Sequence, residues 1–125
     1  MHQFTFDSQD DCIICRGEVF GKERSRTFTM IVDTGSTYTI MPHSALTIFD
    51  RPKLDHFVAI TTGSRVEKAA LVIVPTFKAL GFAVHNFPVI IHNLPPRSPI
   101  DGLLGLNFLK KAKAVIDFSK NKIFI

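Results

Sequence analysis

The residues best suited to chemistry are Asp33-Thr34-Gly35-Ser36, which directly follow an apolar, β-branched run from Thr27 to Val32. Such a run predicts a buried strand with the Asp33 carboxylate at its end. A buried carboxylate is costly unless hydrogen bonds or a function offset the loss of water. Gly35 lets the backbone turn sharply, and its N–H can support the carboxylate. The pattern therefore indicates an acid that is presented for a reaction.

Two other interpretations of Asp33 are open. Aspartate before glycine at the end of a strand commonly bonds its own backbone in a turn. The phosphorylated aspartate of some phosphatases also ends a buried strand, but that class needs a second acid two residues later and alternating helices and strands. Here Gly35 occupies that position, and the segment from Tyr38 to Ile91 lacks helical patterns. The turn is thus the stronger of these two alternatives.

The elements around Asp33 are expected to be short strands. Seven glycines and seven prolines separate segments rich in Val, Ile, Phe and Thr, which predicts an all-β domain. Gly21-Lys22-Glu23 and Gly63-Ser64 should each join two strands as hairpins. One short helix is expected from Asn107 to Lys113, with Asn107 as its N-cap. The predicted strands are Ile13 to Phe20, Arg26 to Val32, Tyr38 to Ile40, His56 to Thr62, Val66 to Val74, Phe82 to Ile91, Ala114 to Asp117 and Lys122 to Ile125.

Composition limits the class of protein. With 125 residues and 46% hydrophobic content, we expect one domain over residues 12–125 and a flexible N-terminal arm over residues 1–11. The net charge of +4 comes from scattered basic residues, so a nucleic-acid partner is not expected. No apolar run is long enough for a membrane span, and no signal peptide follows Met1, which favours a cytoplasmic protein.

Cys12 and Cys15 form a lone Cys-x-x-Cys motif. This pair falls short of a four-ligand zinc site, and the five histidines lack the spacing to complete one. In a strand over residues 12–20 the two thiols would point to opposite faces. We therefore expect ordinary strand cysteines, no metal and no other cofactor.

A second segment with glycines runs from Ile100 to Asn107. Gly102 and Gly105 bracket an apolar pair, so this loop can pack closely against the Asp33 turn and wall a pocket. Asp101 could be considered as a second acid within the same chain, but Leu104 precedes Gly105 and the acidic turn is not reproduced, so we expect Asp101 to cap or brace its own loop.

Val32-Asp33-Thr34-Gly35-Ser36, with Leu103-Leu104-Gly105 and a short helix near the end of the chain, resembles the retroviral-type (retropepsin-like) aspartic proteases and their cellular and bacterial relatives. The resemblance covers nearly the whole chain. It implies a single-lobe acid-protease barrel with one short C-terminal helix, active as a homodimer. The second acidic turn of a two-lobed enzyme is absent, because Leu104 rather than an acid precedes Gly105.

The resemblance implies roles for the four residues of the first motif. Asp33 would be the catalytic carboxylate, and Thr34 would bond across the dimer axis. Gly35 would direct its N–H to the carboxylate and its carbonyl to the substrate, and Ser36 would support the loop.

The resemblance also implies a set of substrate contacts. Ile31 and Leu103 would line pockets for apolar side chains beside the scissile bond. Thr62, Gly63 and Ser64 would form the tip of a flap that closes over the peptide.

Viral members place an arginine after the second glycine and pair it with an acid near the first loop. Leu106 and Thr37 occupy these positions here, so both charges are missing together. The C-terminal residues Lys122 to Ile125 are the expected strand for joining two copies.

These features predict an aspartic endopeptidase that cleaves extended polypeptides through a water molecule activated by two Asp33 carboxylates, one from each subunit. The alternative is a catalytically silent dimer with the same fold that binds peptides by β-strand addition.

Overall fold

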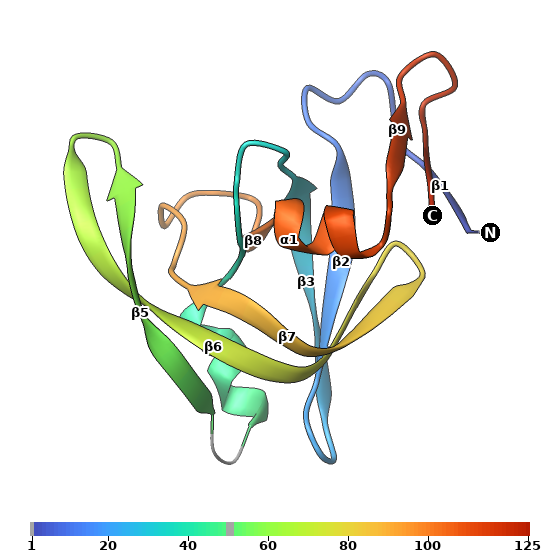
Figure 1. Ribbon diagram of the computed structural model, residues 1–125. Coiled ribbons are helices and arrows are strands. Elements are labelled where there is room, and N and C mark those ends of the chain that lie inside the picture. The colour runs from blue at the N-terminus through green and yellow to red at the C-terminus, as the bar shows by residue number, and fades with distance from the viewer. Residues whose placement is uncertain (1, 50–51) are drawn as a thin grey trace.

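The computed structural model describes residues 2–49 and 52–125. Within these ranges the chain is built mainly of β-strands (Figure 1). The strands are β1 (Gln3–Thr5), β2 (Ile14–Phe20), β3 (Ser25–Val32), β4 (Thr39–Met41), β5 (Lys53–Thr62), β6 (Arg65–Ala79), β7 (Phe82–Ile91), β8 (Gly102–Leu104), β9 (Val115–Asp117) and β10 (Lys122–Phe124). The helices are a 3-10 helix η1 (His43–Ile48) and an α-helix α1 (Leu106–Lys111).

A closed barrel is formed by six strands in the order β2, β3, β8, β4, β7 and β6. The ring closes where β6 also pairs with β2, from Gly17↔Ala79 to Phe20↔Thr76. The pairs β3 with β8 and β4 with β7 run parallel. Closure gives partners to the backbone groups that an open sheet would leave at its edges. The barrel and its short C-terminal α-helix confirm the predicted all-β, single-lobe fold.

The barrel interior holds the main hydrophobic core. Phe108 from α1 packs edge-on against Phe77 from β6, with ring centroids 5.5 Å apart. Met30 on β3 and Leu104 on β8 are fully buried. The strand that leads to the predicted acid and its neighbour β8 are therefore both anchored in the core through alternate residues.

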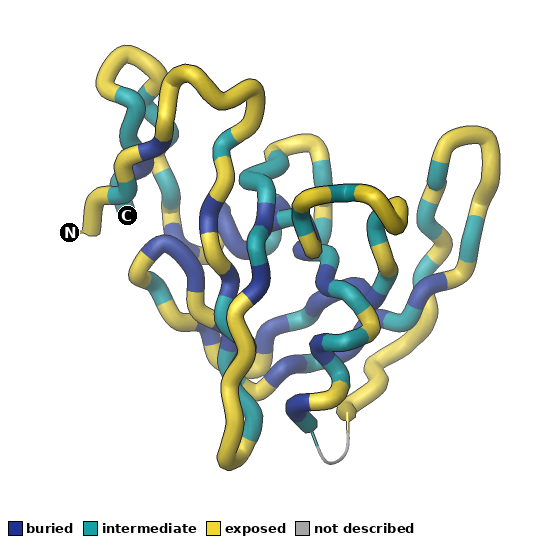
Figure 2. The backbone as a smooth tube through the Cα atoms, turned by 180° about the vertical axis from the view of Figure 1, so that it is seen from behind, coloured by how far each residue is buried: buried dark blue, intermediate teal, exposed yellow. Residues whose placement is uncertain are grey.

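β5 and β6 form a long hairpin that extends from the barrel, on the left in Figure 1. Its two-residue turn is Gly63-Ser64, as predicted, and Gly63 has φ +62°. The tip is exposed (Figure 2). Nearer the barrel, Ala69 and Leu71 from β6 pack with Ile90 from β7 in a second, smaller core.

The chain ends meet in a separate three-stranded sheet in the order β1, β10, β9. Residues 3–5 of the expected flexible arm form β1, which pairs with β10; Met1 lies outside the described residues. β10 pairs on its other side with β9. The expectation that the C-terminal strand could join a partner chain therefore needs correction. Both edges of Lys122–Phe124 already have partners in the same chain.

Other elements also differ from expectation. The expected loop over residues 102–104 is strand β8, because it lies between β3 and β4 and pairs with both. η1 has no counterpart among the predicted elements. α1 begins at Leu106 with Gly105 at the N-cap position, so the prediction that Asn107 is the N-cap is wrong. Asn107 lies inside the first turn, and its side chain has other partners.

Candidate active site

Asp33 immediately follows β3 and is held by the neighbouring strand. Its backbone N–H donates to the Leu104 carbonyl (2.9 Å), and Val32 N–H donates to the Ile13 carbonyl (2.8 Å). The parallel register places Ile31 opposite Leu103. Asp33 is half-buried at the end of the barrel strand. Two strands distant in sequence thus fix the position of this carboxylate.

The loop after β3 turns back on its own acid. Gly35 N–H donates to Asp33 Oδ1 (2.9 Å), which is the hydrogen bond expected from the sequence. Ser36 N–H donates to the Asp33 carbonyl (3.2 Å), and Ser36 Oγ donates to the Tyr38 carbonyl (2.7 Å). Thr34 and Gly35 are exposed. The loop therefore holds the carboxylate from one side and presents two exposed residues beside it.

The second glycine segment packs against this loop as expected. A side chain on Gly105 would place its Cβ 2.4 Å from the Tyr38 carbonyl oxygen and 2.8 Å from that of Ser36. The next two residues extend the contact, because Leu106 N–H donates to the Ser36 carbonyl (2.8 Å) and Asn107 N–H to the Thr37 carbonyl (3.1 Å). Glycine is needed at position 105 because two backbones approach this closely.

Asn107 joins the helix to two barrel strands. Its Oδ1 accepts from both the N–H and the Oγ1 of Thr39 at 2.8 Å, and its Nδ2 donates to the Pro88 carbonyl (2.8 Å). Thr39 is fully buried, and its hydroxyl accepts from Gly105 N–H (3.1 Å). Sequence reasoning missed this network behind the Asp33 loop, because a polar residue in a short helix is also typical of a cap.

Asp101 does not brace its own loop, contrary to expectation. Its carboxylate accepts from Thr29 N–H on β3 (2.8 Å), and its own N–H donates to the Thr29 carbonyl (2.8 Å). Asp101 therefore ties the segment before β8 to the strand that carries the candidate acid.

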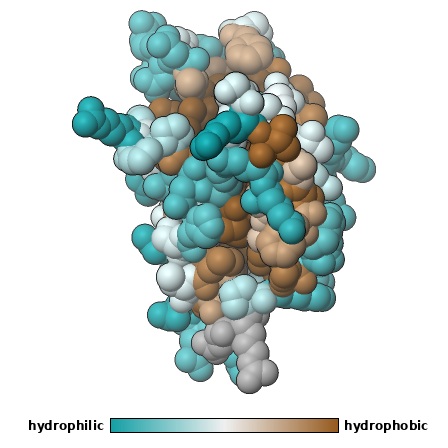
Figure 3. Space-filling view, turned by 90° about the vertical axis from the view of Figure 1, so that its left-hand side faces the viewer, coloured by the Kyte–Doolittle hydropathy of each residue, from teal (hydrophilic) through white to brown (hydrophobic). Residues whose placement is uncertain are grey.

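A cleft of about 560 Å³ lies between the β5–β6 hairpin and the barrel. Two of the predicted contact residues, Thr62 and Leu103, line this cleft. Ile31 pairs with Leu103 in the adjacent strand, while Gly63 and Ser64 form the exposed turn above. On the side of the molecule that carries the hairpin, hydrophobic side chains gather in a band between hydrophilic ones (Figure 3).

The cleft also contains two titratable residues that were not singled out from the sequence. Glu67 on β6 and His92 after β7 face each other, with Oε2 and Nε2 3.9 Å apart. Strand alternation could have identified Glu67, since it shares the inward face of β6 with Ala69 and Leu71. The sequence of the loop after β7 carried no comparable signal for His92.

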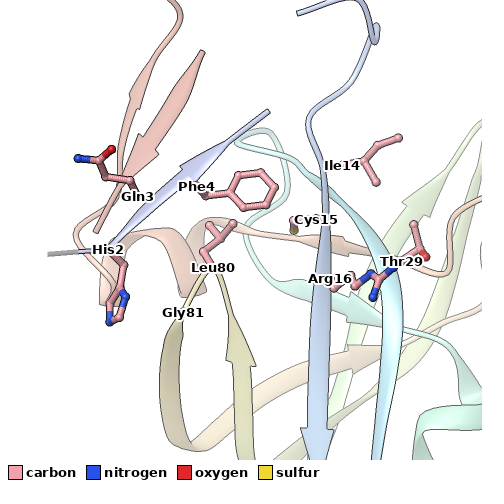
Figure 4. Close-up of a pocket in the computed structure, with 9 residues that line it drawn as sticks. All are labelled: His2, Gln3, Phe4, Ile14, Cys15, Arg16, Thr29, Leu80 and Gly81. Atoms are coloured by element: carbon pink, nitrogen blue, oxygen red, sulfur yellow. The ribbon is translucent and has the colours of Figure 1, made fainter. Parts of the chain in front are cut away.

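A second cavity of about 550 Å³ lies between β1, β2 and the turn after β6 (Figure 4). In it Phe4 points toward β2 and lies close to Leu80. None of the predicted site residues lines this cavity. It is therefore separate from the candidate active site.

The two cysteines differ in environment. Cys12 is exposed and precedes β2, whereas Cys15 is buried in that strand. Burial raises the pKa of the Cys15 thiol to about 12.

Among the described residues, no three His, Cys, Asp or Glu side chains are arranged to hold a metal ion. Within the same ranges, no helix has the length and apolar character to cross a membrane.

Comparison with known proteins points to one family. Residues 16–108 match the family model described as aspartyl protease. Among solved structures, a retropepsin-like aspartic protease from Rickettsia conorii superposes with a TM-score of 0.65 and 19% sequence identity. The alignment covers 97% of this chain and 86% of that one. A search of curated protein sequences gave no match. At this identity the structural likeness establishes a shared fold.

Proposed function

Since this chain belongs to the aspartyl protease family, we propose that it is an endopeptidase that hydrolyses peptide bonds in extended polypeptides as a homodimer. The observation that carries the proposal is the Asp33 loop. A half-buried carboxylate ends a barrel strand and accepts a hydrogen bond from Gly35, and Thr34 is exposed beside it. The same arrangement would suit a carboxylate that must meet its counterpart from a second copy.

A second chain is needed because aspartic proteases, the standard example of this chemistry, use two carboxylates that share one proton. This sequence carries one Asp-Thr-Gly turn. Asp101 is engaged by the backbone of Thr29 and is not placed in such a turn. A twofold axis beside Thr34 would bring a second Asp33 to the first.

In the proposed reaction, the ionised Asp33 carboxylate takes a proton from a water molecule. The water oxygen then attacks the carbonyl carbon of the scissile bond. The protonated Asp33 of the other subunit gives its proton to the carbonyl oxygen. When the tetrahedral intermediate collapses, the C–N bond breaks. The Asp33 that took the water proton gives it to the departing nitrogen, and the other Asp33 takes a proton back from a hydroxyl of the intermediate, which leaves a carboxylic acid and an amine. Gly35 would hold the ionised carboxylate through its N–H and leave its carbonyl for the peptide.

The peptide would lie between the barrel and the β5–β6 hairpin. Ile31 and Leu103 would contact its side chains from below, and Thr62, Gly63 and Ser64 would cover it as a flap. Ser36 would hold the catalytic loop through its bond to the Tyr38 carbonyl.

The test is cleavage of an unstructured protein by the wild-type chain and by Asp33→Asn, from mildly acidic to neutral pH. Asparagine keeps the side-chain shape but cannot take the proton of the water. We expect the rate to fall by more than about a thousandfold. Equal rates in the two proteins would overturn the proposal, and binding without cleavage by the wild type would favour the silent peptide-binding module.

A further inference from the structure

The cleft between the β5–β6 hairpin and the barrel is apolar at its floor and carries one acid at its wall. Ile40 from β4 and Leu103 from β8 form the floor, and Ile60 from β5 faces them. Leu103 precedes Leu104, whose carbonyl binds Asp33 N–H. The cavity wall and the hydrogen bond to Asp33 therefore lie at successive residues of β8, although no residue of the Asp33 loop itself lines the cavity.

Glu67 is the only carboxylate among the residues that line this cavity. It lies directly opposite Ile60 in the hairpin register, so both side chains are on the face turned toward the cleft. The Glu67 side chain is 40% exposed and that of His92 is 25% exposed. Their separation of 3.9 Å exceeds a hydrogen bond. Among the described residues, the Glu67 carboxylate accepts no hydrogen bond, and His92 can form an ion pair with it only when the imidazole is protonated, so the carboxylate oxygens can accept from a ligand.

We infer that this cavity receives a lysine or arginine side chain of the polypeptide substrate and that Glu67 recognises its charge. The inference rests on the proposed protease function and narrows its substrate class. The methylene stem would pack on Ile40, Ile60 and Leu103, and the cationic end would reach the partly exposed acid. A purely apolar side chain would instead remove water from the Glu67 carboxylate without giving it a partner.

The position of Glu67 adds a second consequence. The acid belongs to the hairpin, whereas Ile40 and Leu103 belong to the barrel. A basic side chain that touches both would tie the hairpin to the floor of the cleft while the peptide is bound. The contact between Glu67 and the basic side chain would then both recognise the charge and hold the hairpin closed over the substrate.

Cleavage supplies the first test. A library of unstructured peptides is digested, and the cleavage sites are mapped by mass spectrometry for wild type, Glu67→Gln and Glu67→Lys. Wild type should enrich Lys and Arg at one position near the cut. Glu67→Gln should lower the ratio of kcat/KM for a basic peptide to kcat/KM for its norleucine analogue about tenfold, since a charged hydrogen bond to the basic side chain is lost. Glu67→Lys should favour an acidic residue there.

The matched control is Lys68→Gln, which removes a charge from the opposite face of the same strand, where Lys68 lies over the Phe57 ring. It should leave the preference unchanged. Thermal unfolding of each variant shows whether the hairpin region remains folded. An active, Asp33-dependent protease whose preference is the same in wild type and Glu67→Gln would overturn the inference while the proposed function stands.

Binding supplies a second test that does not need catalysis. The Asp33→Asn protein is titrated with fluorescent peptides that differ only in having lysine or norleucine at the position selected by cleavage. If no cleavage occurs, library peptides that contain lysine and their norleucine analogues are used instead. Lysine should bind about tenfold more tightly, and Asp33→Asn combined with Glu67→Gln should abolish the difference. Equal affinities, or no binding of either peptide, would overturn the inference.

Discussion

The position of Asp33 is held by hydrogen bonds with its own loop and with a neighbouring strand. Gly35 donates to its carboxylate from within the loop, and Leu104 accepts its backbone N–H from another strand. The close approach of Gly105 to the Ser36 and Tyr38 carbonyls completes the support. At this scale the candidate catalytic carboxylate is one member of a small, backbone-bonded unit.

Cys15 allows a prediction about a single side chain. Because burial raises its pKa from 9.0 to about 12, the thiol stays protonated at neutral pH and its thiolate is scarce. Iodoacetamide at pH 8 should therefore label Cys12 in the native protein and reach Cys15 only in denaturant, as measured by intact mass. Two labels on the native protein would contradict the prediction.

The same shift sets the sign of a pH effect. Above pH 9.0 the unfolded chain loses the Cys15 proton while the folded chain keeps it. The stability that the protonated thiol contributes is full below pH 9.0 and is lost as the pH rises toward 12. The free energy of unfolding should therefore fall less between pH 9.0 and 12 in Cys15→Ala than in the wild type. Urea unfolding at several pH values would measure this difference.

At the scale of elements, α1 is short but rigidly attached. Asn107 bonds the buried Thr39 on β4 and the Pro88 carbonyl on β7, and Phe108 packs against Phe77 in the core. The helix therefore fixes the segment that supports the Asp33 loop.

Asn107→Ala tests this attachment. It leaves the N–H of Thr39 and the carbonyl of Pro88 without their partners, and we expect a loss of about 3 kcal/mol in the free energy of unfolding. Lys111→Ala, an exposed change on the same helix, is the control and should cost little. Urea unfolding gives both values. Similar losses in the two variants would show that the Asn107 bonds contribute little to stability.

For the whole molecule, the proposed dimer must use surfaces other than the edges of β10, since β1 and β9 occupy both. The free edges of the terminal sheet belong to β1 and β9. Val115 and Phe118 on or beside β9 are large hydrophobic residues that are exposed. These features and the exposed Thr34 are consistent with a second copy on this side.

Mixing experiments can detect a shared active site. When Asp33→Asn is added to an equal amount of wild type and the subunits exchange, only about half of the wild-type chains will pair with each other. Peptidase activity should then fall to about half of its starting value. An equal amount of serum albumin is the control. Unchanged activity after full exchange, followed by mass-tagged subunits, would contradict a site built from two Asp33 residues.

Local patterns were sufficient to predict much of the molecule. Segments rich in Val, Ile, Phe and Thr between glycines and prolines predicted most strands, the Gly63-Ser64 hairpin and the loop that presents Asp33. These features depend on backbone preferences within a few residues, which the order of amino acids specifies directly. The resemblance carried by the two motifs added the single-lobe barrel.

Contacts between distant segments could not be predicted from such patterns. The pairing of β8 with β3, the closure of β6 on β2 and the position of β10 between two neighbours all depend on which strands meet in three dimensions. The same holds for Asn107 behind the Asp33 loop and for Glu67 facing His92 across the cleft. The sequence alone therefore predicted the candidate acid and the turn in which it lies. The packing of remote strands determined what supports that acid and which charged side chain lines the cleft under the hairpin, because long-range contacts leave no local periodicity.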